Sequence, residues 1–161
     1  MLKNQPEADF IFCDFKNPVH CRQLIRLINH YMTDPMGGSE KLNKEQEQAL
    51  IRGLANHPSS FVLFILYEAH FSGLATCFIN FSTFKAKPYI NVHDVIIDNK
   101  NRGKGLGKML LGKIISIATE RNYCKVNLEV RDDNTVAKNL YQSLGFTDTD
   151  PMMHFWTKSI L

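Results

Sequence analysis

The order of apolar and polar residues predicts a chain that alternates between short strands and longer helices. Apolar side chains recur at helical spacing in four segments, and they alternate or run together in the shorter segments between them. The predicted helices cover residues 18–32, 43–56, 105–121 and 134–144. The predicted strands cover residues 9–15, 61–67, 74–84, 89–97, 124–130 and 152–158. This order indicates a mixed α/β (α+β) domain with a mainly antiparallel sheet.

Two local signals define the elements of the first half of the chain. Asn43 and Gln46 have the spacing of a capping box, which predicts the start of the second helix. Residues 68–73 separate two β-rich segments and end in Gly73, so they are predicted to form the loop of an antiparallel hairpin.

The strand over 89–97 contains a change of phase. Its apolar residues fall on even positions at Ile90 and Val92 and then on odd positions at Val95 and Ile97. Because side chains alternate between the two faces of a strand, such a change predicts a one-residue bulge, which we place near His93–Asp94.

Three glycines at alternate positions, Gly103, Gly105 and Gly107, stand where the third helix is predicted to begin. The dinucleotide fingerprint G-x-G-x-x-G is excluded, because Lys108 occupies its last position. A P-loop pattern that starts at Gly107 lies inside the helix and has Ile114 where a magnesium-binding Ser or Thr is required. The two commoner nucleotide loops are therefore excluded.

The remaining pattern is R-x-x-G-x-G, formed by Arg102, Gly105 and Gly107, directly after a strand and at the start of a helix. Free N–H groups and the positive end of the helix dipole attract phosphate, and glycine lets a phosphate approach the backbone. Each glycine costs a helix about 1 kcal/mol relative to alanine, so three in five residues favour a functional role. The alternative is a turn whose glycines only allow close helix packing.

Composition limits the classes of function. A chain of 161 residues, 44% hydrophobic and 22% charged, is expected to form one domain over 1–161 with a flexible tail over 1–8. It has no membrane-spanning or signal segment, so we expect a cytoplasmic protein without membrane contact. Its four cysteines are scattered, which predicts no metal site. The net charge is +3, with basic residues concentrated over 100–113, which favours a small anionic ligand over nucleic acid.

The second half of the sequence resembles the GNAT superfamily of N-acetyltransferases. Residues 95–107 (VIIDNKNRGKGLG) are similar to the family's acetyl-CoA-binding segment, and the similarity continues through residues 127–146 (NLEVRDDNTVAKNLYQSLGF). The resemblance implies a six- to seven-stranded sheet, splayed after a bulged fourth strand, with about four helices. It also implies that acetyl-CoA is the cofactor. The residues implied to bind it are Val95, Ile96, Ile97, Arg102, Gly103, Lys104, Gly105, Leu106, Gly107, Lys108, Asn134 and Tyr141.

The resemblance further implies direct attack of an amine on the thioester, with a backbone N–H such as that of Val95 facing the developing oxyanion. Tyr141 occupies the position of the family's general acid, and a phenol with a pKa of about 10 can protonate a departing thiolate. The alternative is that Tyr141 belongs to the core, because it lies on an apolar helical stripe.

The amine must lose a proton before it attacks, because an ammonium with a pKa of about 10.4 is charged at pH 7. Glu129, in an L-E-V-R setting similar to that of ribosomal-protein alanine acetyltransferases, is one candidate base. It could equally be a solvated strand residue that pairs with Lys125 or Arg131. His93 and Asp94, at the expected bulge, are the other candidates for base or amine binding.

The segment from His93 through Phe155 also resembles the polyamine acetyltransferases, which usually carry an acidic residue where this chain has His93. The leading hypothesis is an acetyltransferase that acts on a primary amine of a small molecule. The alternatives are acetylation of a protein N-terminus or lysine and, in another class, a non-catalytic acyl-CoA-binding regulatory module. A homodimer is expected from the resemblance alone.

Overall fold

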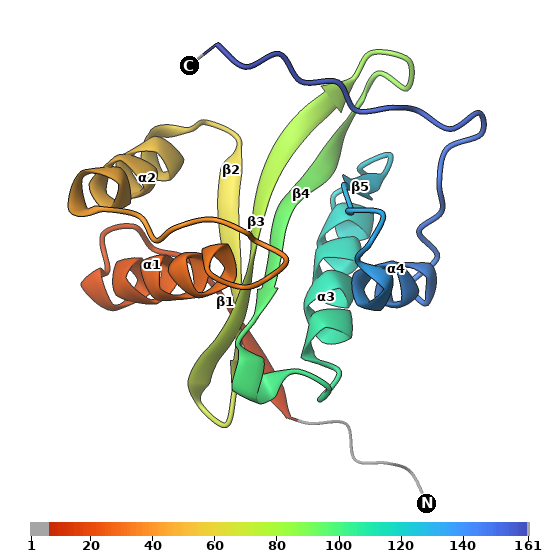
Figure 1. The fold of residues 1–161 in the computed structure, drawn as a ribbon. Coiled ribbons are helices and arrows are strands. Elements are labelled where there is room, and N and C mark those ends of the chain that lie inside the picture. The colour runs from red at the N-terminus through yellow and green to blue at the C-terminus, as the bar shows by residue number, and fades with distance from the viewer. Residues whose placement is uncertain (1–6, 161) are drawn as a thin grey trace, which may run out of the picture.

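A sheet separates two layers of helices in this computed structural model, which describes residues 7–160 (Figure 1). The strands are β1 (Ala8–Phe12), β2 (Ser60–Tyr67), β3 (His70–Ser82), β4 (Lys87–Ile97) and β5 (Val126–Leu128). The helices are α1 (Pro18–Met32), α2 (Lys44–Asn56), α3 (Leu106–Glu120) and α4 (Thr135–Gln142), with a short 3-10 helix, η1 (Asn99–Asn101). The strand order is β1-β2-β3-β4-β5, and β5 alone runs parallel to its neighbour. The predicted class, a mixed and mainly antiparallel sheet with four α-helices, is confirmed.

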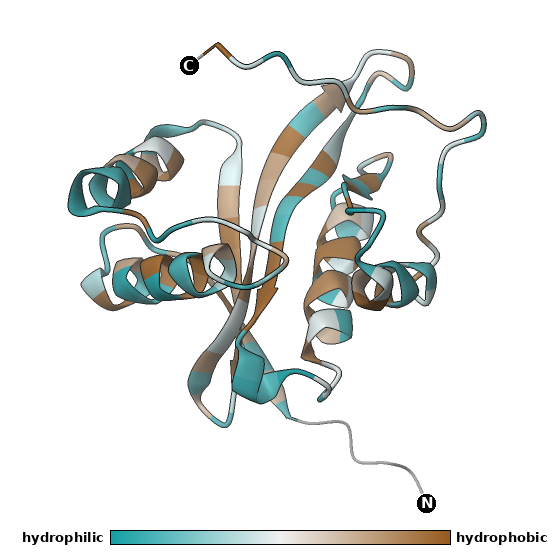
Figure 2. Ribbon diagram, viewed as in Figure 1, coloured by the Kyte–Doolittle hydropathy of each residue, from teal (hydrophilic) through white to brown (hydrophobic). Residues whose placement is uncertain are grey.

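Each face of the sheet carries its own hydrophobic core. On one face, Leu110 and Ile114 of α3 are fully buried against the strands. On the other, Leu24 and Leu27 of α1 and Leu54 of α2 are buried in a second cluster. Figure 2 shows hydrophobic positions gathered on the strands and on the helix surfaces beside them. Burial of each such leucine contributes roughly 1.5–3 kcal/mol, so helix-to-sheet packing holds both layers in place.

The first two helices begin where side chains satisfy their free N–H groups. Asn17 accepts a hydrogen bond from the Val19 N–H at 2.9 Å, and Pro18 follows as the first helical residue. The predicted capping box at α2 is confirmed, because the side chains of Asn43 and Gln46 each accept from the other residue's N–H at 2.9 Å.

Asn43→Ala is expected to lower the free energy of unfolding by about 1 kcal/mol, because the Gln46 N–H in the first turn of α2 loses the side-chain oxygen that accepts its hydrogen bond. Urea denaturation at pH 7 measures the change. Gln48→Ala, at an exposed position of the same helix, is the control and should leave the stability unchanged or slightly raised. Equal stabilities of the Asn43→Ala variant and the native chain would contradict the capping role.

The β2–β3 hairpin differs from the sequence prediction in its turn. The loop was expected over 68–73, but the strands pair up to Tyr67 and His70, so that Glu68 and Ala69 alone make the turn. Both residues have positive φ angles, 51° and 61°, which the sequence does not mark with glycine or asparagine. Gly73 lies inside β3, where a Cβ atom would approach the Ile96 carbonyl oxygen to 2.5 Å. Its role is close strand packing.

The predicted bulge in β4 is confirmed. Thr76 of β3 pairs with Asp94 and Cys77 pairs with Val92, so His93 is the extra residue. Side chains before the bulge, such as Val92, and after it, such as Val95, therefore pack into the same core beneath α3.

Two predictions about the end of the chain are wrong. The strand over 124–130 is shorter, Val126–Leu128, and the strand over 152–158 is absent from the described residues, which leaves five strands in the sheet. An alternating pattern forms a strand only where a sheet edge pairs with it. Here Phe155 and Trp156 are 75% and 88% exposed. Of the expected tail over 1–8, residues 1–6 lie outside the described part, and Ala8 already belongs to β1.

In residues 7–160 no helix has both the length and the apolar character needed to cross a bilayer.

Candidate active site

An opening in the sheet lies beside the second half of β4. β5 pairs with β4 only at Ile90, Asn91 and Val92. Beyond the bulge, β4 continues through Val95, Ile96 and Ile97 with β3 on one side and no strand on the other within the described chain. Figure 1 shows β4 extending past β5 toward the start of α3. The backbone groups of this segment that point away from β3 are thus available to an extended ligand.

The glycine stretch lies at the end of this opening and leads into α3. Gly103 and Gly105 have φ angles of 76° and 79°, and a Cβ atom at either position would meet nothing within 4 Å. Gly105 is the N-cap of α3. Between residues 7 and 160, no acceptor is found for the six backbone N–H groups from Gly103 to Lys108. An open row of donors at the positive end of a 15-residue helix is suited to a phosphate group.

Ion pairs fix this loop to the rest of the protein. Asp98, directly after β4, accepts from Arg26 of α1 at 2.7 Å. Arg102 pairs with Asp34 at 2.9 Å and donates from Nε to the Ile97 carbonyl at 3.1 Å. The side chain of Arg102 is therefore engaged within the protein, while the neighbouring backbone N–H groups remain free. These contacts position the loop between β4 and α1.

Both carboxylates have lowered pKa values. For Asp98, burial acts to raise the pKa, but the hydrogen bond and charge of Arg26 outweigh it. For Asp34, the Met36 N–H is the main cause, and Arg102 adds to it. Because these pKa values lie below those of the unfolded chain, each carboxylate stabilises the fold above about pH 4. That stability is lost as the pH falls through the folded-state pKa.

Asp98→Asn is expected to lower the free energy of unfolding at pH 7 by about 1.5 kcal/mol, because Arg26 loses a charged hydrogen-bond partner. The deficit relative to the native chain should shrink from pH 7 to pH 2, as the native carboxylate becomes protonated. Denaturant titrations across this range measure it, with Glu120→Gln at an exposed site as the control. A deficit that stays constant with pH would contradict the charge-based explanation.

The other residues expected at the glycine loop have distinct surroundings. Lys104 donates to Asn101 at 2.8 Å, and its ammonium lies 4.6 Å from the Tyr67 ring centroid. Leu106 is buried in the core, and a Cβ at Gly107 would lie 3.1 Å from a methyl group of Leu140 in α4. Gly107 thus has the helix-packing role that the sequence left open, while Gly103 and Gly105 have the exposed, left-handed conformation.

Tyr141 lies on α4, with its ring partly buried against the core beneath α3 and 6.0 Å from the ring of Phe146. Burial raises the pKa of its phenol, and the nearby Tyr31 phenol raises it further. The hydroxyl therefore stays protonated at neutral pH, as a proton donor must.

Asn134, expected near the cofactor, is the N-cap of α4 and accepts from the Ala137 N–H at 3.1 Å.

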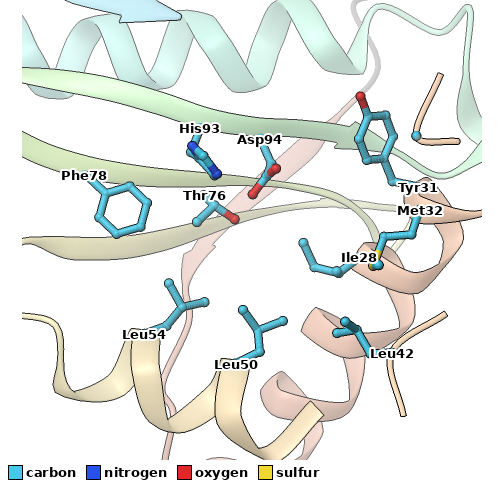
Figure 3. A pocket seen from close by; sticks show the side chains of 11 residues that line it. Ile28, Tyr31, Met32, Leu42, Leu50, Leu54, Thr76, Phe78, His93 and Asp94 are labelled. Atoms are coloured by element: carbon cyan, nitrogen blue, oxygen red, sulfur yellow. The ribbon is translucent and has the colours of Figure 1, made fainter. Parts of the chain in front are cut away.

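A cavity of about 380 Å³ lies between the sheet and the layer of α1 and α2. Figure 3 shows His93 and Asp94 at its sheet wall beside Thr76, facing the helix side chains. The bulge places these two consecutive residues in the same lining. Glu129 is exposed just after β5 and is not among the lining residues.

Burial raises the pKa of Asp94, while His93 and the Thr76 hydroxyl act to lower it. The Thr76 hydroxyl lies near this carboxyl but outside hydrogen-bond geometry, and it has no partner among the described residues. Sequence reasoning missed Tyr31 and Thr76 as site residues. Tyr31 has helical spacing from Leu24 and Ile28, a pattern typical of core packing, and only the fold brings it to the cavity.

Comparison with known proteins identifies the relatives of this chain. A family model described as the acetyltransferase (GNAT) family matches residues 24–146. The chain is 34% identical over 65 residues to N-acetyltransferase 8B of Homo sapiens, a match that covers 40% of this chain and 29% of that protein. It is 39% identical over 57 residues to the ribosomal protein bS18-alanine N-acetyltransferase of Haemophilus influenzae, covering 35% of this chain and 38% of that protein. Less than half the length of these curated relatives is therefore matched.

The fold is also similar to that of a solved protein. A crystal structure described as a probable acetyltransferase superposes with a TM-score of 0.80 at 18% identity, covering 94% of this chain and 97% of that one. At this identity the similarity concerns the fold alone. Because the family model matches residues 24–146, which is more than half of the sequence, the chain belongs to the acetyltransferase (GNAT) family.

Proposed function

We propose that this protein is an N-acetyltransferase that transfers an acetyl group from acetyl-CoA to a primary amine of a small molecule in a ternary complex. One observation carries the proposal. The free N–H groups of residues 103–108 lie at the end of the unpaired part of β4, and the bulge in the same strand places His93 and Asp94 in a cavity. A cofactor site and an acceptor site thus meet on one strand.

The residues present fit acetyl-CoA. Gly103 and Gly105 leave open space where a Cβ atom would stand, so the backbone donors of 103–108 can hold a pyrophosphate. On the side of Val95–Ile97 that faces away from β3, the strand offers backbone groups to the amide groups of the pantetheine arm, apart from the Ile97 carbonyl that accepts from Arg102. Bound acetyl-CoA supplies an acetyl thioester, whose C–S bond breaks as the amine nitrogen forms the new C–N bond.

Residues of this chain transfer the protons of the thiolate and the amine, and they stabilise the charge that develops on the carbonyl oxygen. The Tyr141 hydroxyl holds the proton that the departing sulfur takes, and the N–H of Val95 faces the charge that develops on the carbonyl oxygen. Asp94 and His93 hold the amine and accept its proton. Glu129, exposed beyond β5, is the second candidate for base, acting through water.

Size favours a small acceptor over a polypeptide. The cavity of about 380 Å³ lies near the lower end of the range that holds small organic ligands. Acetylation of a protein N-terminus or lysine is the alternative, with the acceptor chain entering from the surface.

A cytoplasmic location and a homodimer belong to the same proposal, and light scattering after size-exclusion chromatography tests the dimer.

Thermal stability with ligand tests the cofactor. Acetyl-CoA is expected to raise the Tm, because a ligand that binds only the folded state stabilises it, whereas NADH and ATP should do so weakly. Release of free CoA thiol in the presence of an amine panel then tests catalysis. Stabilisation by acetyl-CoA without thiol release on any amine or peptide would favour a non-catalytic binding module. Stabilisation by ATP alone would overturn the proposal.

A further inference from the structure

The titratable acidic and basic side chains of the cavity are confined to one wall. Thr76, His93 and Asp94 project from β3 and β4, and the opposite wall is formed mainly by aliphatic side chains of α1, α2 and the loop between them, with the phenol of Tyr31 on α1 (Figure 3). Phe78 lies on the sheet side next to His93, with ring centroids 5.8 Å apart. The apolar residues that line the cavity are Ile28, Met32, Leu42, Leu50, Leu54 and Phe78.

Asp94 is the single acidic residue of this lining, and the neighbouring His93 is the only basic side chain beside it there. Over residues 7–160, neither an ion pair nor a hydrogen bond is found for its carboxylate. The Thr76 hydroxyl beside it is 3% exposed and also unpartnered. A partly buried carboxylate without an ion-pair partner is unfavourable, so the pair of groups is suited to an ammonium that the ligand brings.

Two further acidic residues near the cavity, Asp34 and Glu47, are already engaged. Asp34 pairs with Arg102, and Glu47 of α2 pairs with Lys44 and accepts from Asn29. A ligand with several ammonium groups would therefore place its second charge among leucine and isoleucine side chains. That arrangement is unfavourable, because an unpaired charge loses its hydration there.

From this division we infer that the acceptor is a primary monoamine with an alkyl or arylalkyl body. Its ammonium docks at Asp94 and Thr76, and its body lies among Ile28, Leu50, Leu54 and Phe78. This inference rests on the proposed function for the transfer step, but the binding of the amine is independent of it. Polyamines, aminoglycosides and polypeptide N-termini are the classes that the apolar wall rejects.

Direct binding is the first test and needs no acetyl-CoA. Phenethylamine should bind the full chain in a calorimetric titration, and Asp94→Asn should weaken this binding at least tenfold. Asp148→Asn, an exposed aspartate in the C-terminal part, is the matched control and should bind as the native chain does. Circular dichroism checks that both variants are folded. Equal binding by Asp94→Asn and the native chain would overturn the assignment of the ammonium site.

Turnover is the second test. With acetyl-CoA, kcat/KM should be at least tenfold higher for phenethylamine or hexylamine than for spermidine or kanamycin. Leu50→Phe, which fills part of the apolar wall, should raise the KM of phenethylamine several-fold and leave that of acetyl-CoA unchanged. A preference for spermidine or kanamycin would overturn this inference while supporting the acetyltransferase proposal. Monoamine binding without turnover on any amine would support the inference and count against that proposal.

Discussion

Gly105→Ala is expected to raise the Kd of acetyl-CoA at least tenfold. Gly105 has a φ angle of 79°, where an alanine is strained by about 1–2 kcal/mol. A methyl group would also project into the open space beside the donors at residues 103–108. Either the loop shifts, so that the donors no longer converge, or the methyl group meets the phosphate. Calorimetric titration with acetyl-CoA measures the change.

Two further variants separate the causes. Gly112→Ala, in the middle of α3 with nothing within 4 Å of the new Cβ, should leave the Kd unchanged and raise stability by up to about 1 kcal/mol. Gly105→Asn tolerates the left-handed conformation but still adds a Cβ atom. Recovery of binding in Gly105→Asn would assign the loss to backbone strain, and no recovery would assign it to the approach of the ligand. Native-like binding by Gly105→Ala would show that this loop is not the pyrophosphate site.

Tyr141→Phe is expected to lower kcat about 100-fold with little change in either KM, because the phenol proton is needed only as the thiolate departs. The phenylalanine ring keeps the packing against Phe146 and the core. Stability should therefore change little. Since the pKa of Tyr141 is raised above its ordinary value of 10, native activity should show no loss from this group up to about pH 9.

Tyr31→Phe is the matched control, because it removes a neighbouring phenol that, after burial, raises the pKa of Tyr141. A small effect on kcat is expected. Steady-state kinetics with one monoamine acceptor compares both variants with the native chain. A 100-fold loss in Tyr31→Phe together with unchanged turnover in Tyr141→Phe would reverse the two roles.

The sequence predicts best where one local interaction decides an element. α1 spans Pro18–Met32 as expected, because Asn17 and Pro18 mark its start, and α2 begins at its capping box. The bulge at His93 was predictable because the apolar residues of β4 change from even to odd positions along the sequence. The β2–β3 turn was not, since Glu68 and Ala69 adopt left-handed conformations that neighbouring strands impose.

The features of the candidate site also fall into those that a local pattern predicts and those that depend on distant segments. The glycine pattern indicated free backbone donors at a helix start, and the loop has them. The engagement of Arg102 with Asp34 depends on two segments that lie far apart in the sequence, so no local pattern reveals it. The same holds for Tyr31 and Thr76, which join Asp94 at the cavity only after the sheet and α1 have packed.

The ion pair between Arg102 and Asp34 links two regions with different tasks. Arg102 belongs to the loop that leads into α3, and Asp34 belongs to the segment after α1 that helps enclose the cavity. A ligand that orders one of these segments therefore alters the freedom of the other. Thermodynamic linkage requires the effect to be reciprocal: whatever factor acetyl-CoA adds to the affinity of the amine, the amine adds to the affinity of acetyl-CoA. Under the proposed function, this ion pair therefore couples the binding of acetyl-CoA to the binding of the amine.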